Sequence, residues 1–123
     1  MGEIVYGLPD ETDLTFFIGT ELQQVCIGRH EVILRFGDDL SITVESDIGH
    51  RSTLGELDAV FKSIVPAAMV LCNLINATVS SASVKSPGTL VLQFSNGEAL
   101  EIYDSNTSYE SYQIACGDRL IVV

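Results

Sequence analysis

The stretch SPGTLVLQFSNGEALEIYD, residues 86–104, decides the fold because it holds two β-strand patterns around one turn. Apolar residues alternate with other residues on both sides of Asn96-Gly97, a dipeptide typical of tight β-hairpins. We therefore expect residues 87–104 to form the central hairpin of a β-sheet. The inward-facing residues of this hairpin would be Leu90, Leu92, Phe94, Leu100 and Ile102.

Alternation of the same kind predicts further strands, separated by turn residues such as Gly and Asp. These expected strands cover residues 21–27, 30–36, 40–46, 77–85, 109–116 and 120–123. A helical spacing appears instead at Leu57, Val60, Phe61 and Ile64. Pro66 then suits the first turn of a second helix. The sequence thus predicts an α+β fold: a mainly antiparallel, bent sheet or partial barrel of about seven strands, with one or two helices at about 54–64 and 66–74 packed on it.

A chain of 123 residues is expected to form a single domain. Residues 1–12 are polar and predict a loose N-terminal arm, and residues 47–52 predict a polar loop. The pattern Ile18-Gly19-x-x-Leu22-x-x-Val25 returns as Ile75-Asn76-x-x-Val79-x-x-Ala82. We interpret this as an internal duplication of a strand-plus-hairpin unit, residues 18–46 and 75–105, around a helical insert at residues 53–74. Independent convergence on a β-strand pattern is the alternative.

The chain is strongly acidic, with 17 Asp and Glu against 6 Lys and Arg and a net charge of −11. The six cations stand singly along the sequence, so nucleic acid and anionic membranes are poor partners. The acidity is explained either by solubility or by electrostatic steering toward a basic protein partner. The apolar residues 66–74 and the final strand favour a homodimer.

The amino terminus lacks the cationic and apolar segments of a signal peptide. The longest apolar run, residues 64–74, is too short to span a bilayer. Cys26, Cys72 and Cys116 are odd in number and lie outside any C-x-x-C motif, as is typical of buried cysteines in a reducing compartment. A zinc site or a redox pair is the alternative. These features predict a cytoplasmic protein.

No catalytic or cofactor motif is present, since G-x-S-x-G, Walker A, G-x-G-x-x-G and H-E-x-x-H are all absent from the sequence. His30 and His50 are expected at the surface, and Asp38-Asp39 are expected to form a turn. We therefore predict no catalytic residues, no metal site and no cofactor. A metal-assisted hydrolase that uses His30 or His50 is a further alternative.

The string Tyr109-Glu110-Ser111-Tyr112 is the most unusual local feature of the sequence. Aromatic residues with a polar group are frequent at the rims of interfaces and pockets. One hypothesis is therefore a partner-contact surface or small-ligand pocket, whose residues would be Tyr103, Asp104, Tyr109, Glu110 and Tyr112. The alternative is cross-strand packing with a hydrogen bond from a tyrosine hydroxyl.

Several motifs together resemble a known pattern. They are Ile18-Gly19-x-x-Leu22-x-x-Val25-Cys26-Ile27-Gly28, Gly88-Thr89-Leu90-x-Leu92-x-Phe94-x-x-Gly97-x-x-Leu100, the Tyr109–Tyr112 string and the apolar end Leu120–Val123. The chain resembles small bacterial proteins that are grouped as a domain of unknown function. This resemblance implies a small cytosolic protein, similar in some cases to immunity or accessory proteins, and it transfers no catalytic residue. We expect a non-enzymatic protein-interaction module, either an acidic adaptor or an immunity-type protein. The alternative is a small-ligand-binding module with a pocket lined by tyrosines 103, 109 and 112.

Overall fold

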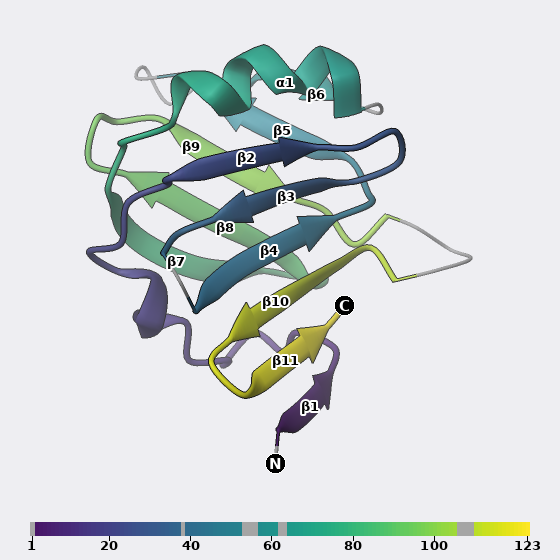
Figure 1. Cartoon of the computed structure of the whole chain (residues 1–123). Coiled ribbons are helices and arrows are strands. Elements are labelled where there is room, and N and C mark those ends of the chain that lie inside the picture. The colour runs from purple at the N-terminus through teal and green to yellow at the C-terminus, as the bar shows by residue number, and fades with distance from the viewer. Residues whose placement is uncertain (1, 38, 53–56, 62–63, 106–109) are drawn as a thin grey trace.

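The computed structural model describes residues 2–37, 39–52, 57–61, 64–105 and 110–123, and for 57–61 and 64–66 it describes the backbone alone. Within these residues the chain forms two β-sheets, one α-helix and one short 3-10 helix (Figure 1). The elements in chain order are β1 (Glu3–Tyr6), η1 (Thr15–Phe17), β2 (Gln24–Ile27), β3 (Val32–Arg35), β4 (Leu40–Val44), β5 (Ile48–Arg51), β6 (Leu57–Phe61), α1 (Ile64–Asn73), β7 (Val79–Lys85), β8 (Thr89–Phe94), β9 (Ala99–Ile102), β10 (Tyr112–Cys116) and β11 (Arg119–Val122).

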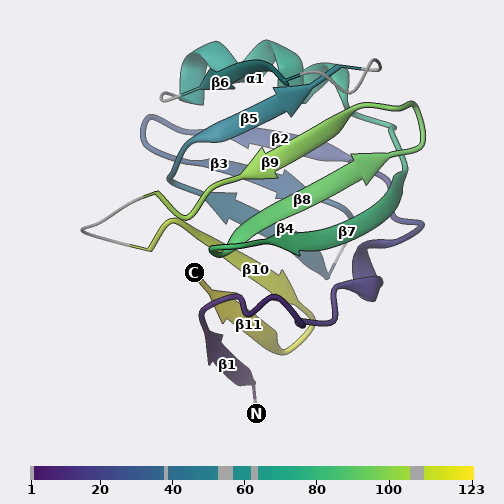
Figure 2. The ribbon, with the colours of Figure 1, turned by 180° about the vertical axis from the view of Figure 1, so that it is seen from behind.

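The strands form two open sheets that face each other, as the opposite views in Figures 1 and 2 show. The six-stranded sheet has the order β1-β11-β10-β4-β3-β2, and the five-stranded sheet has the order β6-β5-β9-β8-β7. Neighbouring strands are antiparallel except β1 and β11, which are parallel. The α+β class and the mainly antiparallel pairing are confirmed. Within the described residues the strands outnumber the predicted seven or so, and they do not close into a barrel.

The hairpin of residues 87–104 forms β8 and β9 inside the five-stranded sheet, as predicted. Its loop has three residues rather than two, because Phe94 N–H donates to Glu98 O (2.9 Å). Gly97 takes a left-handed backbone with φ of 92°, whereas Asn96 does not. The two-residue turn needs both residues left-handed, and so the longer loop forms. The inward residues are buried as expected: Leu90, Leu92, Phe94, Leu100 and Ile102.

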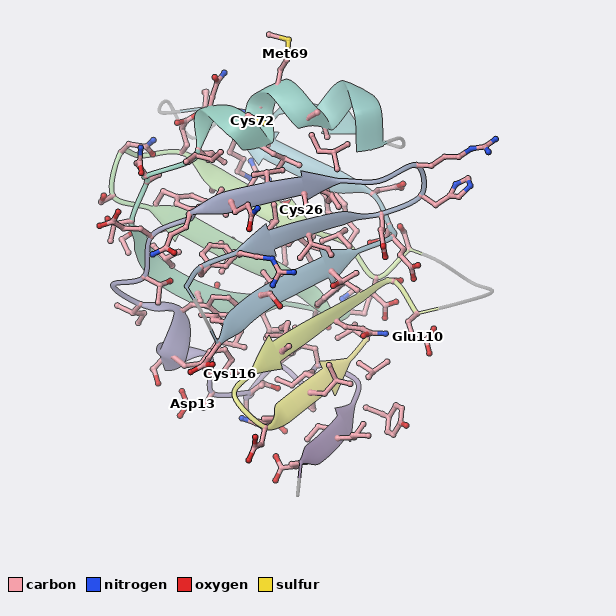
Figure 3. The ribbon with its side chains drawn as sticks, viewed as in Figure 1. Asp13, Cys26, Met69, Cys72, Glu110 and Cys116 are labelled. Carbon is pink, nitrogen blue, oxygen red and sulfur yellow. The ribbon has the colours of Figure 1, made fainter. Side chains whose placement is uncertain are left out.

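The core lies between the two sheets and is filled by aliphatic side chains from both. From β3, β4 and β10 the buried inward residues are Val32, Leu34, Ile42, Val44 and Ile114. The helix α1 packs against β2 and β6 and lies across the top of the two sheets in Figure 1. Ala67, Leu71 and Leu74 face the core. Met69 is 78% exposed and points away from the fold (Figure 3).

The helix predicted at about 54–64 is wrong, because residues 57–61 form β6 and pair with β5. The apolar residues of this segment recur at helical spacing, but Leu57, Ala59 and Phe61 also alternate at strand spacing. Pairing with β5 decides between the two patterns, since tertiary contacts override local propensity. The helix predicted at 66–74 is confirmed as α1. Pro66 lies in its first turn, where a missing N–H does no harm.

Two segments that were expected to be irregular are strands. The N-terminal arm contains β1, which pairs along β11. The polar loop expected at residues 47–52 contains β5, which lies between β6 and β9. Ile48, Gly49 and His50 are all buried, so β5 has no solvent-facing side to produce an alternating pattern.

The two segments of the predicted duplication make matching backbone hydrogen bonds. Gly19 N–H donates to Val79 O (2.9 Å), and the counterpart Asn76 N–H donates to Leu22 O (2.7 Å). Counterparts differ by 57 in residue number (19 and 76, 22 and 79). Gly19 and Asn76 are also both left-handed, with φ of 86° and 79°. A residue with a side chain rarely adopts left-handed backbone, so its occurrence at Asn76 as well as at Gly19 supports the match between the two segments.

The strand order extends this correspondence. Each three-stranded run, β2-β3-β4 or β7-β8-β9, is followed by a hairpin that joins the other sheet. β5–β6 adds to β9, and β10–β11 adds to β4. Without β1, the two sheets of the described residues have the same order. The predicted duplication of residues 18–46 and 75–105 stays a prediction, which these matched contacts support. The segment 53–74 contains β6 and α1 rather than helices alone.

Candidate functional site

The outer face of the six-stranded sheet carries two rows of side chains that cross all of its strands. Side chains alternate along a strand, so the neighbours of the buried Leu34, Ile42 and Ile114 point outward. The register aligns the first row as Tyr6, Val122, Gln113, Thr43, Ile33 and Cys26. The second row is Ile4, Leu120, Ala115, Ser41, Arg35 and Gln24. We call these two rows the outer stripe. Arg35 is its single charged residue, whereas 19% of the residues of the whole chain are charged.

The side chains of the outer stripe are exposed or half-exposed except Val122, which is buried. In Figure 1 this face is turned toward the viewer, and α1 lies above the β2 edge rather than in front of the sheet. No helix or strand of the described residues lies over it. Ile4 and Tyr6 are 58% and 76% exposed. Its exposed or half-exposed apolar members include Ile4, Leu120 and Ile33, and apolar side chains gathered at the surface are typical of a protein-interaction site.

Acidic residues border the outer stripe at both ends. Glu31 precedes β3 and Glu45 follows β4, so these two carboxylates lie at one end of the sheet. Asp39 precedes β4 and Asp118 lies in the β10–β11 turn, at the other end. The bond from Gly117 N–H to Asp39 O (2.9 Å) holds those two turns together. We call these two pairs of carboxylates the acidic rims. A partner on this face would meet a surface with one charge, that of Arg35, between two acidic borders.

Tyr112 lies in the core rather than at the surface, with 1% of its side chain exposed. Its hydroxyl donates to Gly88 O (2.6 Å) and so ties β10 of one sheet to the β7–β8 turn of the other. Burial, and then the negative charge of Asp104, raises the pKa of Tyr112 well above its ordinary value. The Tyr112 hydroxyl is therefore buried and hydrogen-bonded within the fold.

The other residues of the predicted contact surface lie around the β9–β10 loop. Asp104 is exposed, and its Oδ1 accepts a hydrogen bond from Ser111 Oγ (2.9 Å). Glu110 is exposed at the same loop (Figure 3). Tyr109 lies outside the described residues. The contact surface and the tyrosine-lined pocket both stay predictions.

A buried ionic cluster on the five-stranded sheet was missed by the sequence analysis. Glu101 is 4% exposed; its Oε2 accepts from Arg51 Nε (2.6 Å) and its Oε1 accepts from the Tyr103 hydroxyl (3.0 Å). Burial opposes ionisation of Glu101, but the hydrogen bonds from Arg51 and Tyr103 outweigh it and lower its pKa. Burial raises the pKa of Tyr103 to about 12, and the bond to Glu101 contributes.

The Tyr103 side chain covers Gly49 of β5. A methyl group added at Gly49 would overlap the Tyr103 hydroxyl and lie 3.1 Å from ring carbon Cζ. Glycine at this position therefore makes room for the ring. The cluster fixes β5 against β9 with satisfied hydrogen bonds. No sequence signal connects Arg51 with Glu101, because 50 residues separate them and each sits in an ordinary strand pattern.

The histidines and cysteines do not assemble into a metal site within the described residues. His50 is buried, contrary to expectation, and its Nε2 lies 2.9 Å from Glu98 Oε1. His30 is exposed near the β2–β3 turn. No group of three His, Cys, Asp or Glu side chains able to hold a metal is found in the part of the chain that the structure describes. The three cysteines are free.

Comparison with known proteins identifies a family but no individual relative for this chain. No helix among the described residues is long and apolar enough to cross a membrane. No curated protein and no solved structure matches the chain. Residues 14–123 match the family of unknown function DUF6188, a region that contains η1, α1 and β2 to β11 but not β1. The expected resemblance to a family of unknown function is confirmed, and the chain belongs to this family.

Proposed function

We propose that this protein is a non-enzymatic interaction module, an acidic adaptor or immunity-type protein, that binds a basic protein across the outer stripe. The observation that carries the proposal is the pair of side-chain rows with one charge, uncovered by any described element and bordered by the acidic rims. Protein interfaces have the same composition, with few charges at the centre and a polar border.

The charge of the chain favours a basic partner over a second copy. Two copies that met through the outer stripe would each bring a net charge of −11 and two acidic rims. Like charges across an interface are unfavourable, whereas complementary charges accelerate association. The predicted homodimer therefore remains a competing outcome, which would use a different surface such as the exposed Met69 side of α1.

The proposal predicts a specific dependence on salt. The acidic rims are solvent-exposed or half-exposed, and salt screens charges at the surface within about 8–10 Å at physiological ionic strength. Association with a basic partner should therefore slow as salt rises. Contacts of the apolar side chains in the outer stripe do not weaken with salt, so part of the affinity should persist.

The test begins with affinity capture from an extract of the native host at low salt, followed by titration of the purified partner. Ile33→Lys places a positive charge within the outer stripe, and Gln93→Lys adds the same charge on the exposed face of the other sheet. We expect a partner with a high isoelectric point, at least tenfold weaker binding by Ile33→Lys because it repels that partner, and unchanged binding by Gln93→Lys.

Two results would count against the proposal. One is that the chain binds only itself at every ionic strength. The other is a partner whose affinity is the same for wild type and for a folded Ile33→Lys variant. Tyr6→Lys supplies a second probe with little effect on folding, because Tyr6 is 76% exposed.

A further inference from the structure

Strand β1 is the edge strand of the six-stranded sheet, next to β11. It lies outside residues 14–123, the region that matches the family. It is also the one described strand without a counterpart in the five-stranded sheet, where β6 takes the place of β11. Its neighbours in the chain do reach the core, since Leu8 is buried. The strand itself is an attachment to the edge of β11.

β1 is an edge strand, and β11 is the one strand of the described residues that pairs with it. Its backbone pairs with β11 and is fixed at its ends by Glu3 N–H to Asp118 O (2.9 Å) and Gly7 N–H to Val122 O (2.7 Å). Val5 packs partly against the core. Glu3 and Arg119 form an ion pair (3.0 Å) in which both side chains are well exposed. Such surface ion pairs stabilise weakly.

We propose that the edge of β11 is an acceptor site for an extended peptide strand of a partner protein, and that β1 covers this edge until the partner strand replaces it. Strand addition to a sheet edge uses backbone hydrogen bonds for affinity and alternate side chains for specificity. The site shares Ile4 and Tyr6 of β1 with the outer stripe, but the inference rests on the pairing of β1 with β11 and stands without the proposed function.

The contacts between β1 and β11 indicate which residues a strand must have to bind at this edge. A side chain at Gly2 would lie 2.6 Å from Asp118 O, so a glycine is needed there. The next residue is acidic because it faces Arg119. Val5 points inward and requires an aliphatic residue. Gly7 is left-handed with φ of 85° and requires a second glycine. The accepted segment therefore has the form glycine, acid, any residue, aliphatic, any residue, glycine, and it runs parallel to β11.

The probe is a fluorescein-labelled peptide with the sequence of residues 2–8, GEIVYGL, added to the full-length chain. The attached β1 competes with this peptide at a high effective concentration, so wild type should bind weakly. Val5→Asp in the chain weakens its own β1 but leaves the peptide intact. We expect at least tenfold tighter binding by Val5→Asp than by wild type, because the competing state is depopulated. Amide signals of residues 119–122 should shift on binding.

Ser83→Asp is the matched control, since it adds the same charge at an exposed position on β7, and it should bind as wild type does. A second pair keeps the test informative if Val5→Asp fails to fold. Arg119→Glu repels the Glu3 of its own β1, and a peptide with Glu3→Lys restores the ion pair. The Glu3→Lys peptide should bind the Arg119→Glu protein at least tenfold more tightly than it binds the wild-type protein. The proposal is overturned if folded Val5→Asp and Arg119→Glu bind their peptides no more tightly than Ser83→Asp does.

Discussion

Gly49→Ala should destabilise the protein, and the reason is the Tyr103 ring. Gly49 is not one of the left-handed glycines, so its backbone suits any residue. Alanine in a strand is ordinarily better than glycine by about 0.5–1 kcal/mol. Here the added methyl group overlaps the Tyr103 hydroxyl and comes within 3.2 Å of ring carbon Cε2. The ring must move, and its hydrogen bond to Glu101 is strained or lost.

The magnitude follows from these opposing contributions. Overpacking by a methylene-sized group costs about 1–3 kcal/mol, and loss of one hydrogen bond costs about 1 kcal/mol. The stability gained by replacing glycine with alanine in a strand offsets part of these two costs. We therefore expect a net loss of about 1–3 kcal/mol in the free energy of unfolding. In a Tyr103→Ala background the same substitution should be neutral or stabilising by about 0.5 kcal/mol.

Urea denaturation followed by far-ultraviolet circular dichroism measures both effects, and the chain has no Trp to use instead. The four proteins of the cycle are wild type, Gly49→Ala, Tyr103→Ala and the double variant. The reasoning is refuted if Gly49→Ala stabilises the wild type. It is also refuted if the substitution has the same effect in both backgrounds, because the ring would then not be the cause.

The remaining predictions concern the ionic cluster, the bond between the sheets and the matched left-handed positions. Glu101→Gln should lose about 1–3 kcal/mol at pH 7. The pKa of Glu101 in the folded protein lies below its ordinary 4.5, so the extra stability of wild type over the variant is complete above pH 4.5. That extra stability should disappear as the pH falls through the folded pKa, which denaturation at a series of pH values would show. Tyr112→Phe should lose about 1–2 kcal/mol because Gly88 O loses its buried donor, and an unchanged urea midpoint would contradict this. Gly19→Ala should destabilise by about 1 kcal/mol and Asn76→Gly should not, because both positions are left-handed; thermal unfolding of the two variants checks the pair.

Sequence patterning was sufficient where a strand has one buried and one exposed face. The alternation around Leu34 and Leu92 predicted both strands and the inward residues, because one face of each strand packs on the core. The α1 helix was found from its apolar run and Pro66. The pattern could not separate a helix from a strand at residues 57–61, where apolar residues fit both spacings.

The candidate site depends on contacts that a single sequence does not display. The outer stripe appears only after the register of the six strands is known, since its rows combine Tyr6, Ile33 and Gln113 from distant parts of the chain. Tyr112 was expected at a contact surface, but it shares the inward face of β10 with Ile114 and is buried. Its hydroxyl bond to Gly88 O agrees with the alternative interpretation of this strand, cross-strand packing with a hydrogen bond from a tyrosine hydroxyl.

Cysteine footprinting of the partner complex tests the central claim most directly. Cys26 lies in the outer stripe, Cys72 is exposed on α1, and both are free (Figure 3). The measurement is the rate of alkylation of each thiol by iodoacetamide, read by mass spectrometry with and without the captured partner. A partner on the outer stripe should slow alkylation of Cys26 at least fivefold and leave Cys72 unchanged. An unchanged rate at Cys26, or protection of Cys72 alone, would show that the partner binds elsewhere.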